Sequence, residues 1–126
     1  MVERQPLSKG ETEIARILWE IGPATVRQVH EVIARSKEID FATVQTYLRR
    51  IEKKGYASSK LKGRVRLYSA KAQPRTVIRD TVNDLVERLF GGEAMPLMRH
   101  LIEDRGIDAD DLVELRRLID ELEQRK

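Results

Sequence analysis

Apolar residues recur with helical spacing in the first third of the chain, and two of the helices they predict start at a capping signal. A first helix is expected after Ser8, where Glu11 follows three residues later as in a capping box, and Gly22-Pro23 should end it. Thr25 and Gln28 repeat the capping pattern for a second, shorter helix. The expected inner positions are Ile14, Ile17, Leu18 and Ile21 in the first helix, and Val26, Val29 and Ile33 in the second.

Residues 42–54 are expected to form a third helix, for which Asp40 is a suitable N-cap and Gly55 a suitable left-handed C-terminal cap. Its apolar residues recur at i, i+4 and i+7, the period of one helical face, and they are Val44, Leu48 and Ile51. The opposite face is polar, with small or hydrogen-bonding side chains first and cations afterwards. One face should anchor this helix, and the other should be open for recognition.

Two segments with β character follow, residues 56–61 and 64–69, and Lys62-Gly63 should form the turn between them. In the second segment, Val65 and Leu67 share one face, while basic residues and Tyr68 share the other. A hairpin that only covers the core would account for Val65 and Leu67 but not for the cationic tip. Three helices followed by a hairpin predict a winged helix-turn-helix, so the expected fold is mainly α with a small β-hairpin wing.

The remainder of the chain is expected to be helical. Pro74 suits the first turn of a helix that Gly91-Gly92 ends, Pro96 leaves the start of the next helix uncertain, and Asp108 can cap the last one. The sequence therefore predicts a winged helix-turn-helix DNA-binding domain over residues 1–73 and a helical dimerisation domain over residues 74–126.

Short amphipathic helices with few aromatic residues form a poor independent core, so we expect these to bury their apolar stripes against a second copy. The alternative is that they fold back onto the winged helix in a monomer. The residues assigned to dimerisation are Ile78, Val82, Leu85, Leu89, Leu97, Leu101, Leu112, Leu115, Ile119 and Leu122.

The charges divide the chain in the same place. Residues 1–74 contain 15 Lys and Arg against 8 Asp and Glu, a net charge of +7, whereas the rest contains 9 against 13, a net charge of −4. A charged helix face is usually only solvated, but such faces usually mix signs. Between Arg49 and Arg66 eight basic residues face one acid, Glu52. This bias indicates that only the first part of the chain meets a polyanion.

We therefore predict that the third helix reads a DNA major groove, while the tip of the hairpin lies along the backbone or places an arginine in a minor groove. The predicted DNA-binding residues are Ala42, Thr43, Gln45, Thr46, Arg49, Arg50, Lys53, Lys54, Lys62, Arg64 and Arg66.

Composition excludes several other classes of function. With no cysteine, the chain can form no disulfide, thiolate metal site or thiol nucleophile. Its two histidines, His30 and His100, are too isolated to indicate a metal site or a catalytic centre, so we expect neither cofactor nor enzyme activity. No apolar run approaches membrane-spanning length and no signal peptide is visible, so a cytoplasmic protein without membrane contact is expected.

Several short stretches, each weak alone, are more specific in their order and spacing. They are Ile17-Leu18-Trp19-Glu20, Gly22-Pro23-Ala24-Thr25, Thr43-Val44 through Leu48, Lys53-Lys54-Gly55-Tyr56, Gly63-Arg64 with Tyr68-Ser69, Leu89-Phe90-Gly91-Gly92, and Asp111-Leu112 through Leu115. Together they resemble the bacterial penicillinase and methicillin-resistance repressor family over nearly the whole chain. The resemblance implies a homodimeric winged-helix repressor on a palindromic operator, with Thr43 and Thr46 where the family's reading helix touches DNA.

Two departures from that family concern regulation. In its antibiotic-responsive members, a membrane-linked protease signal leads to cutting of an Asn-Phe bond, and the corresponding pair here resembles His100-Leu101. The similar copper-responsive branch senses copper through C-terminal cysteine pairs, which this chain lacks. The expected function is a sequence-specific DNA-binding transcriptional repressor, and the alternative is a winged-helix protein-interaction module. The operator, the regulated genes, the inducing signal and the route of release, by a regulatory protease, a ligand or another partner, stay open.

Overall fold

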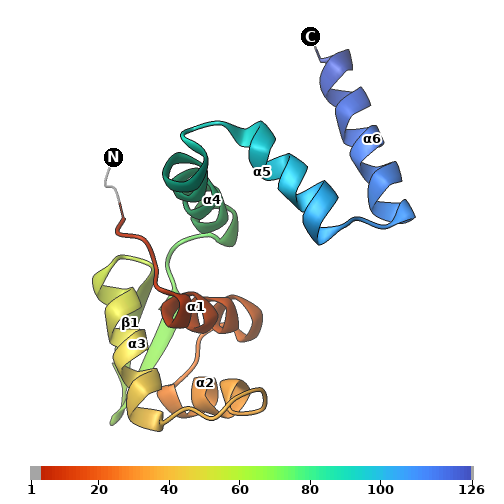
Figure 1. Ribbon diagram of the computed structural model, residues 1–126. Coiled ribbons are helices and arrows are strands. Elements are labelled where there is room, and N and C mark those ends of the chain that lie inside the picture. The colour runs from red at the N-terminus through yellow and green to blue at the C-terminus, as the bar shows by residue number, and fades with distance from the viewer. Residues whose placement is uncertain (1–3, 126) are drawn as a thin grey trace. The chain divides into compact units, whose positions relative to one another are not determined.

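The computed structural model describes residues 4–125 and is mainly helical with one antiparallel hairpin, as the sequence predicts (Figure 1). In chain order its elements are α1 Lys9–Ile21, α2 Val26–Ile33, α3 Phe41–Lys53, β1 Ala57–Lys62, β2 Val65–Ala70, α4 Pro74–Phe90, α5 Ala94–His100, η1 Leu101–Arg105, which is a π-helical turn, and α6 Ala109–Gln124. The chain forms two compact units, the first ending at Thr81 and the second beginning at Val82.

Helices α1, α2 and α3 and the hairpin surround the core of the first unit. The apolar positions predicted for the three helices are buried in it, apart from Ile21, which is 43% exposed, and Val26, which is half-buried. The prediction that Ile21 faces the core is wrong because it is the last residue of α1, where the chain leaves the packed layer. The largest fully buried side chains are Tyr68, Ile14, Leu18, Leu48, Ile51, Val29 and Val44.

Local capping fixes the ends of these helices. Both predicted capping boxes are confirmed: in α1 the amide of Ser8 donates to the Glu11 carboxylate at 2.9 Å, and in α2 Thr25 and Gln28 make the equivalent bonds. Asp40 is the N-cap residue of α3, but its side chain makes no capping hydrogen bond. At the other end of α3, Gly55 has φ +91° and the amide of the following residue donates to Ile51 at 2.8 Å, as in a Schellman motif.

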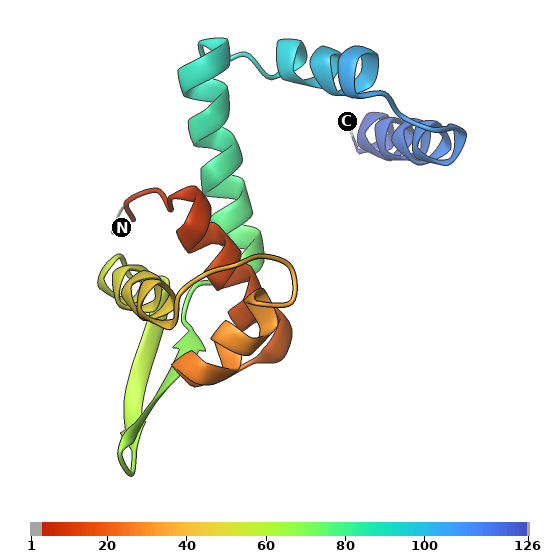
Figure 2. The same cartoon turned by 60° about the horizontal axis from the view of Figure 1, so that its bottom comes forward.

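The hairpin extends from the helices of the first unit as a wing (Figure 2). Lys62 pairs with Val65, so the two-residue turn is Gly63-Arg64, one residue later than predicted. Gly63 has φ +66°, the value needed at the first central position of a type II′ turn. Because a glycine accepts this conformation without strain, it occupies the first turn position and shifts the strands by one residue.

The face of β2 that enters the core is the opposite of the one suggested by Val65 and Leu67. Tyr68 is 2% exposed, whereas Val65 is 51% exposed and Leu67 is half-buried. The reason is a bridge to Ala24, in the short connection between α1 and α2. The amide of Ala24 donates to the carbonyl of Tyr68 at 2.9 Å, and the amide of Tyr68 donates to the carbonyl of Ala24 at 2.8 Å. This long-range pairing seats the Tyr68 ring in the core, so its half-buried neighbours Leu67 and Ser69 lie on the opposite face of β2.

The segment that follows the hairpin is attached to the first unit. Trp19 donates its indole N–H to the carbonyl of Ala72 at 3.2 Å, and Val77 in the first turn of α4 is 4% exposed. The first unit therefore includes the start of α4, whereas the predicted domain boundary lies between residues 73 and 74, just before that helix.

The second unit consists of the rest of α4 with α5, η1 and α6. Asp108 caps α6 by accepting from the amide of Asp111 at 2.8 Å, and Pro96 lies in the first turn of α5, where its missing N–H leaves no acceptor unpaired. Within the described part of this unit, no residue is buried. Over residues 4–125, no helix is both long enough and apolar enough to cross a membrane.

Candidate nucleic-acid interface

The surface of α3 that points away from the core contains most of the predicted DNA-binding residues. Ala42, Thr46, Arg49, Arg50 and Lys53 are exposed, and Thr43 and Gln45 are half-buried. We call these seven residues the reading face. On the opposite side of the helix, Val44, Leu48 and Ile51 are 0% exposed and fix the orientation of α3. One face of α3 therefore anchors the helix in the core, while the other is open to solvent.

The start of the reading face offers hydrogen-bonding groups on short side chains. The hydroxyl of Thr46 donates to the carbonyl of Ala42 at 3.0 Å, so its oxygen remains an acceptor. Gln45 carries an amide that can both donate and accept. Beside Ala42, which has only a methyl group, these side chains leave room for a large ligand surface to approach the first two turns of α3.

The end of the reading face is cationic and uncompensated. In residues 4–125, Arg49, Arg50 and Lys53 form no ion pair, and Lys62 and Arg64 at the wing tip form none either. All five side chains are exposed. Unpaired cations on neighbouring elements attract phosphate groups, because neutralising them in water requires an external anion.

The single acid of this stretch points to the wing and links it to α3. Ser59 donates its hydroxyl to Glu52 at 2.6 Å, and Arg66 donates to the Ser59 hydroxyl oxygen at 2.9 Å. The hydrogen-bonded chain joins α3, β1 and β2. Arg66 therefore has a structural partner as well as an exposed guanidinium, and the carboxylate of Glu52 is engaged at the wing.

Lys54 differs from the other predicted contact residues because its charge is already paired. Its ammonium contacts the Glu11 carboxylate at 2.6 Å and donates to the carbonyl of Pro6 at 3.1 Å. The Glu11 side chain is 3% exposed. Burial alone would raise the pKa of Glu11, but the hydrogen bond and charge of Lys54, together with the Ser8 amide, lower this pKa below its ordinary value. Lys54 therefore joins α3 to α1, and we leave it out of the interface.

The N-terminal segment makes a second attachment to the end of α3, which the sequence did not reveal. Arg4 donates to the carbonyl of Gly55 at 3.1 Å, and its guanidinium lies 5.8 Å from the centre of the Tyr56 ring. The Tyr56 hydroxyl donates to the carbonyl of Gln5 at 2.5 Å, and burial raises the pKa of Tyr56. These contacts join residues about fifty positions apart, so no local pattern could predict them.

Phe41 is another residue that sequence reasoning missed. It is the first residue of α3 and is 48% exposed at the start of the reading face. Its ring meets that of His30 edge-on, with the centroids 5.8 Å apart. The ring nitrogen Nε2 of His30 bonds the carbonyl of Ile39 at 2.9 Å. No group of three or more potential metal ligands occurs within residues 4–125.

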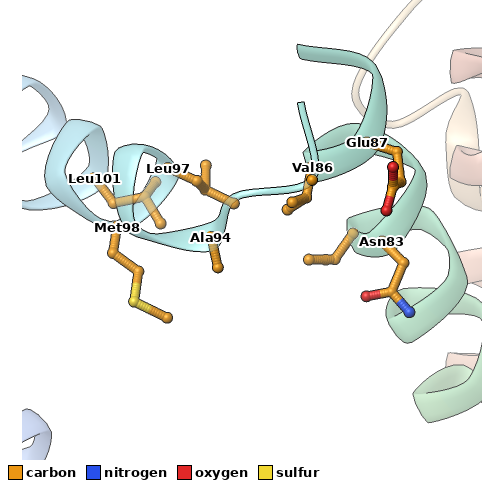
Figure 3. Close-up of a pocket in the computed structure, with 9 residues that line it drawn as sticks. Asn83, Val86, Glu87, Ala94, Leu97, Met98 and Leu101 are labelled. Atoms are coloured by element: carbon orange, nitrogen blue, oxygen red, sulfur yellow. The ribbon is translucent and has the colours of Figure 1, made fainter. Parts of the chain in front are cut away.

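The predicted dimerisation residues lie on the exposed faces of α4, α5, η1 and α6. Exposed fractions reach 70% for Leu89, 59% for Leu122 and 57% for Ile78, while Leu85, Leu97 and Leu115 are half-buried. A groove with a volume of ≈480 Å³ lies between the second part of α4 and α5, and Figure 3 shows side chains that line it. It is lined mainly by apolar side chains, including Val82, Val86, Leu97, Met98 and Leu101, with Asn83 and Glu87 on the α4 side.

Comparison with known proteins extends over nearly the whole chain. A family model described as Penicillinase repressor matches residues 7–121. The penicillinase repressor of Bacillus licheniformis is 22% identical over 120 residues, which cover 95% of this chain and 94% of that protein. The methicillin resistance regulatory protein MecI of Staphylococcus aureus strain N315 is 22% identical over 113 residues, covering 90% and 92%.

A solved structure resembles the first part of the chain. It is the solution structure of the monomeric form of Bacillus licheniformis BlaI in complex with the blaP half-operator, which is 24% identical with a TM-score of 0.50. The match covers 59% of this chain and 90% of that chain. At this level of identity the likeness concerns the fold, and it confirms the winged helix-turn-helix predicted from the order of elements.

Proposed function

The chain belongs to the penicillinase repressor family, and from that premise we propose that it represses transcription by binding a palindromic operator as a homodimer. The observation that carries this proposal is the reading face, whose cations have no partner in the described chain, placed opposite a fully buried apolar face on the same helix. The family members are transcriptional repressors and not enzymes. The target of such a bacterial repressor lies in the cytoplasm, where we place the protein.

Within this proposal the reading face and the wing have different tasks. The first turns of α3 enter the major groove, where Ala42, Thr43, Gln45, Thr46 and Arg49 contact base edges. Arg50, Lys53, Lys62, Arg64 and Arg66 contact phosphates or the adjacent minor groove. Base contacts set which sequence is preferred, whereas phosphate contacts contribute affinity to every sequence.

A second copy is the proposed occupant of the apolar surface of the second unit. Its stripe on α6, formed by Leu112, Leu115, Ile119 and Leu122, has the spacing of a helix that packs on another helix. The groove between α4 and α5 offers an apolar surface of suitable kind, and the net negative charge of this part keeps it away from DNA phosphates. Two winged-helix units held together in a dimer would match the two half-sites of a palindrome.

A winged helix can also serve only as a protein-interaction module. The strongly basic stretch from Arg49 to Arg66 argues against that alternative, because the cores of protein interfaces are depleted in charged residues, and one sign of charge over a whole surface suits a polyanion better. Binding to duplex DNA separates the two functions directly: an interaction module would show no preference among duplex sequences.

The test is selection of a preferred site from random duplexes, followed by titration of that site at several salt concentrations. Two half-sites with roughly three to five phosphate contacts each should give a slope of log K against log salt of about −5 to −9. Arg64→Ala should weaken binding to all sequences, while changes at Gln45, Thr46 or Arg49 should alter the preferred sequence. Arg117→Ala is the matched control, because this arginine pairs with Glu114 and Glu121 on α6. A slope near zero, or no enriched sequence, would overturn the proposal.

A further inference from the structure

Phe41 is an exposed aromatic residue where the proposed reading helix begins. It is 48% exposed, whereas the other strongly apolar residues of α3, Val44, Leu48 and Ile51, are 0% exposed. Ala42 follows it and Gln45 lies one turn further on the same side of the helix. A large apolar side chain therefore stands next to the short polar side chains that begin the reading face.

The ring of Phe41 is held by the helix before it. The ring of His30 in α2 meets it edge-on, with a centroid distance of 5.8 Å and an interplanar angle of 64°. His30 is in turn held by the 2.9 Å bond between Nε2 and the carbonyl of Ile39, in the loop that leads into α3. For a carbonyl partner, Nε2 must carry the hydrogen. Because the ring has a defined support, little side-chain freedom remains to be lost when a ligand packs on it.

The chemistry of the major groove indicates what this ring contacts. The base edges there present hydrogen-bond donors, acceptors and one apolar group, the C5-methyl of thymine. A benzyl side chain cannot bond the donors or acceptors, but it packs favourably on a methyl group. In helix-turn-helix proteins the base contacts come from the N-terminal residues of the recognition helix, which is where Phe41 stands.

We propose that Phe41 is a specificity-determining residue that selects thymine at one position of each half-site through its C5-methyl group. The inference rests on the proposed function and deepens it, since it names the chemical group that an apolar member of the interface reads. His30 is the positioning residue for this contact. Arg49 and Gln45 read donors and acceptors further along α3, so the proposed contact adds an apolar element to an otherwise polar readout.

The test removes the methyl group and the ring separately. The wild-type protein first selects its preferred duplex, and each thymine of that duplex is then replaced in turn by deoxyuridine, which differs only by the methyl group. At one thymine per half-site the replacement should weaken wild-type binding about fourfold, the effect of one buried methyl-sized group. For Phe41→Ala, deoxyuridine at the same position should bind as well as thymine.

Two further variants separate readout from folding. Phe41→Leu keeps an apolar side chain and should retain the thymine preference. Ile21→Ala truncates a comparably exposed apolar residue, 43% exposed at the end of α1, and should leave the penalty unchanged. Circular dichroism and binding to a random duplex should be the same for Phe41→Ala and wild type, which shows that the helix still forms.

The outcomes distinguish this inference from the function on which it rests. A sequence that is enriched but whose thymine-to-deoxyuridine penalties are equal for wild type and Phe41→Ala would overturn the inference alone. A preferred half-site without any thymine would do the same. Failure to enrich any sequence would overturn the proposed function together with the inference. A penalty confined to one thymine, lost in Phe41→Ala and kept in Phe41→Leu, supports it.

Discussion

The two units of the chain differ in how far their apolar side chains are buried. All fifteen buried hydrophobic residues of the described chain lie at or before Val77, in the first unit. In the second unit large apolar residues remain exposed, among them Leu89 at 70% and Leu122 at 59%. Exposure on this scale along successive helices marks a surface meant for another macromolecule. The first unit therefore completes its core with its own chain, whereas the apolar side chains of the second stay exposed, where the proposed second copy would cover them.

The largest effect is expected from a charge in the apolar surface of the second unit. Leu115→Asp places a carboxylate in the proposed contact between copies, where an uncompensated charge costs several kcal/mol. The variant should dissociate into single chains and keep a folded first unit. It should bind a palindromic site about 10² to 10⁴ times more weakly, because the effective concentration that comes from linking two winged-helix units is lost. Sedimentation and gel shifts on a palindrome and on one half-site measure both effects.

The control variant is Asp110→Leu, in the acidic first turn of α6, which replaces an acid by an apolar residue instead of the reverse. It should leave binding to the palindrome unaltered. A wild-type protein that sediments as a monomer at micromolar concentration contradicts the proposed association of two copies through the second unit. So does a Leu115→Asp protein that binds the palindrome normally.

A leucine-to-alanine change should lower stability at every protein concentration in the first unit, but only at concentrations where copies associate in the second. Leu48→Ala removes a 0% exposed side chain from the core of the first unit and should lower its free energy of unfolding by about 2–5 kcal/mol at any protein concentration. Leu122→Ala should cost stability only where copies associate, so its effect should disappear on dilution. Thermal unfolding over a range of concentrations tests both, and a concentration-independent loss in Leu122→Ala argues that α6 packs within its own chain.

Two neighbouring lysines of the first unit, Lys53 and Lys54, should affect different properties of the protein. Lys54→Met leaves the buried Glu11 carboxylate without its cation and should lower the free energy of unfolding by about 1–3 kcal/mol. Lys53→Met changes an exposed residue, so we expect a stability change within about 0.5 kcal/mol but weaker binding to all duplexes. Chemical denaturation and duplex titration of both variants give the two readouts, and identical behaviour of the pair would contradict the structural role of Lys54.

The pH dependence of stability should report the same ion pair. Because the pKa of Glu11 is lowered in the folded chain, its contribution to stability is present above the ordinary value of 4.5 and is lost as pH falls through the lowered pKa. In Lys54→Met, burial acts without the opposing charge and should raise this pKa. The stability difference between wild type and variant should therefore be greatest near neutral pH. It should shrink as the pH falls first through the raised pKa of the variant and then through the lowered pKa of the wild type.

The smallest expected change concerns the second unit during induction. His100 ends α5 and Leu101 begins η1, at the pair that resembles the family's cleavage position. Because neither residue matches the Asn-Phe pair that the family resemblance leads us to expect at a cleavage site, we predict that the chain stays intact when its regulated genes are switched on. Mass spectrometry of the protein from induced cells tests this, and a fragment that ends at residue 100 would show that cleavage does occur.

Patterns of residues close together in the sequence were enough to predict most of the fold. The capping boxes of Ser8 and Thr25, the buried stripe of α3 and the cap at Gly55 each depend on residues within about four positions, so the sequence alone was enough to predict them. The order of these elements was then sufficient to predict the wing. The candidate interface followed from the same local reading, because the face of α3 opposite a buried stripe is exposed by geometry.

Contacts between distant parts of the chain determine the features that the local patterns did not predict. Tyr68 turned into the core because it pairs with Ala24, forty-four residues earlier, and this reversed the expected faces of the wing. The pairing of Lys54 with Glu11, forty-three residues earlier in the chain, could not be predicted from the basic stretch alone. The sequence pattern did not single out Phe41, because an apolar residue at the start of a helix has no special local signal. Its ring is held by His30 of α2, a contact that only the folded structure shows.

The bond from Trp19 to Ala72 makes the chain its own spectroscopic probe. There is one tryptophan in the sequence, and its indole is tied to the carbonyl just before α4, inside the first unit. Intrinsic tryptophan emission therefore follows loss of the first unit, while far-ultraviolet circular dichroism follows the helices of both. If the two signals change at different temperatures, the units unfold separately. Stabilisation by DNA and stabilisation by a second copy can thus be told apart without attaching a label.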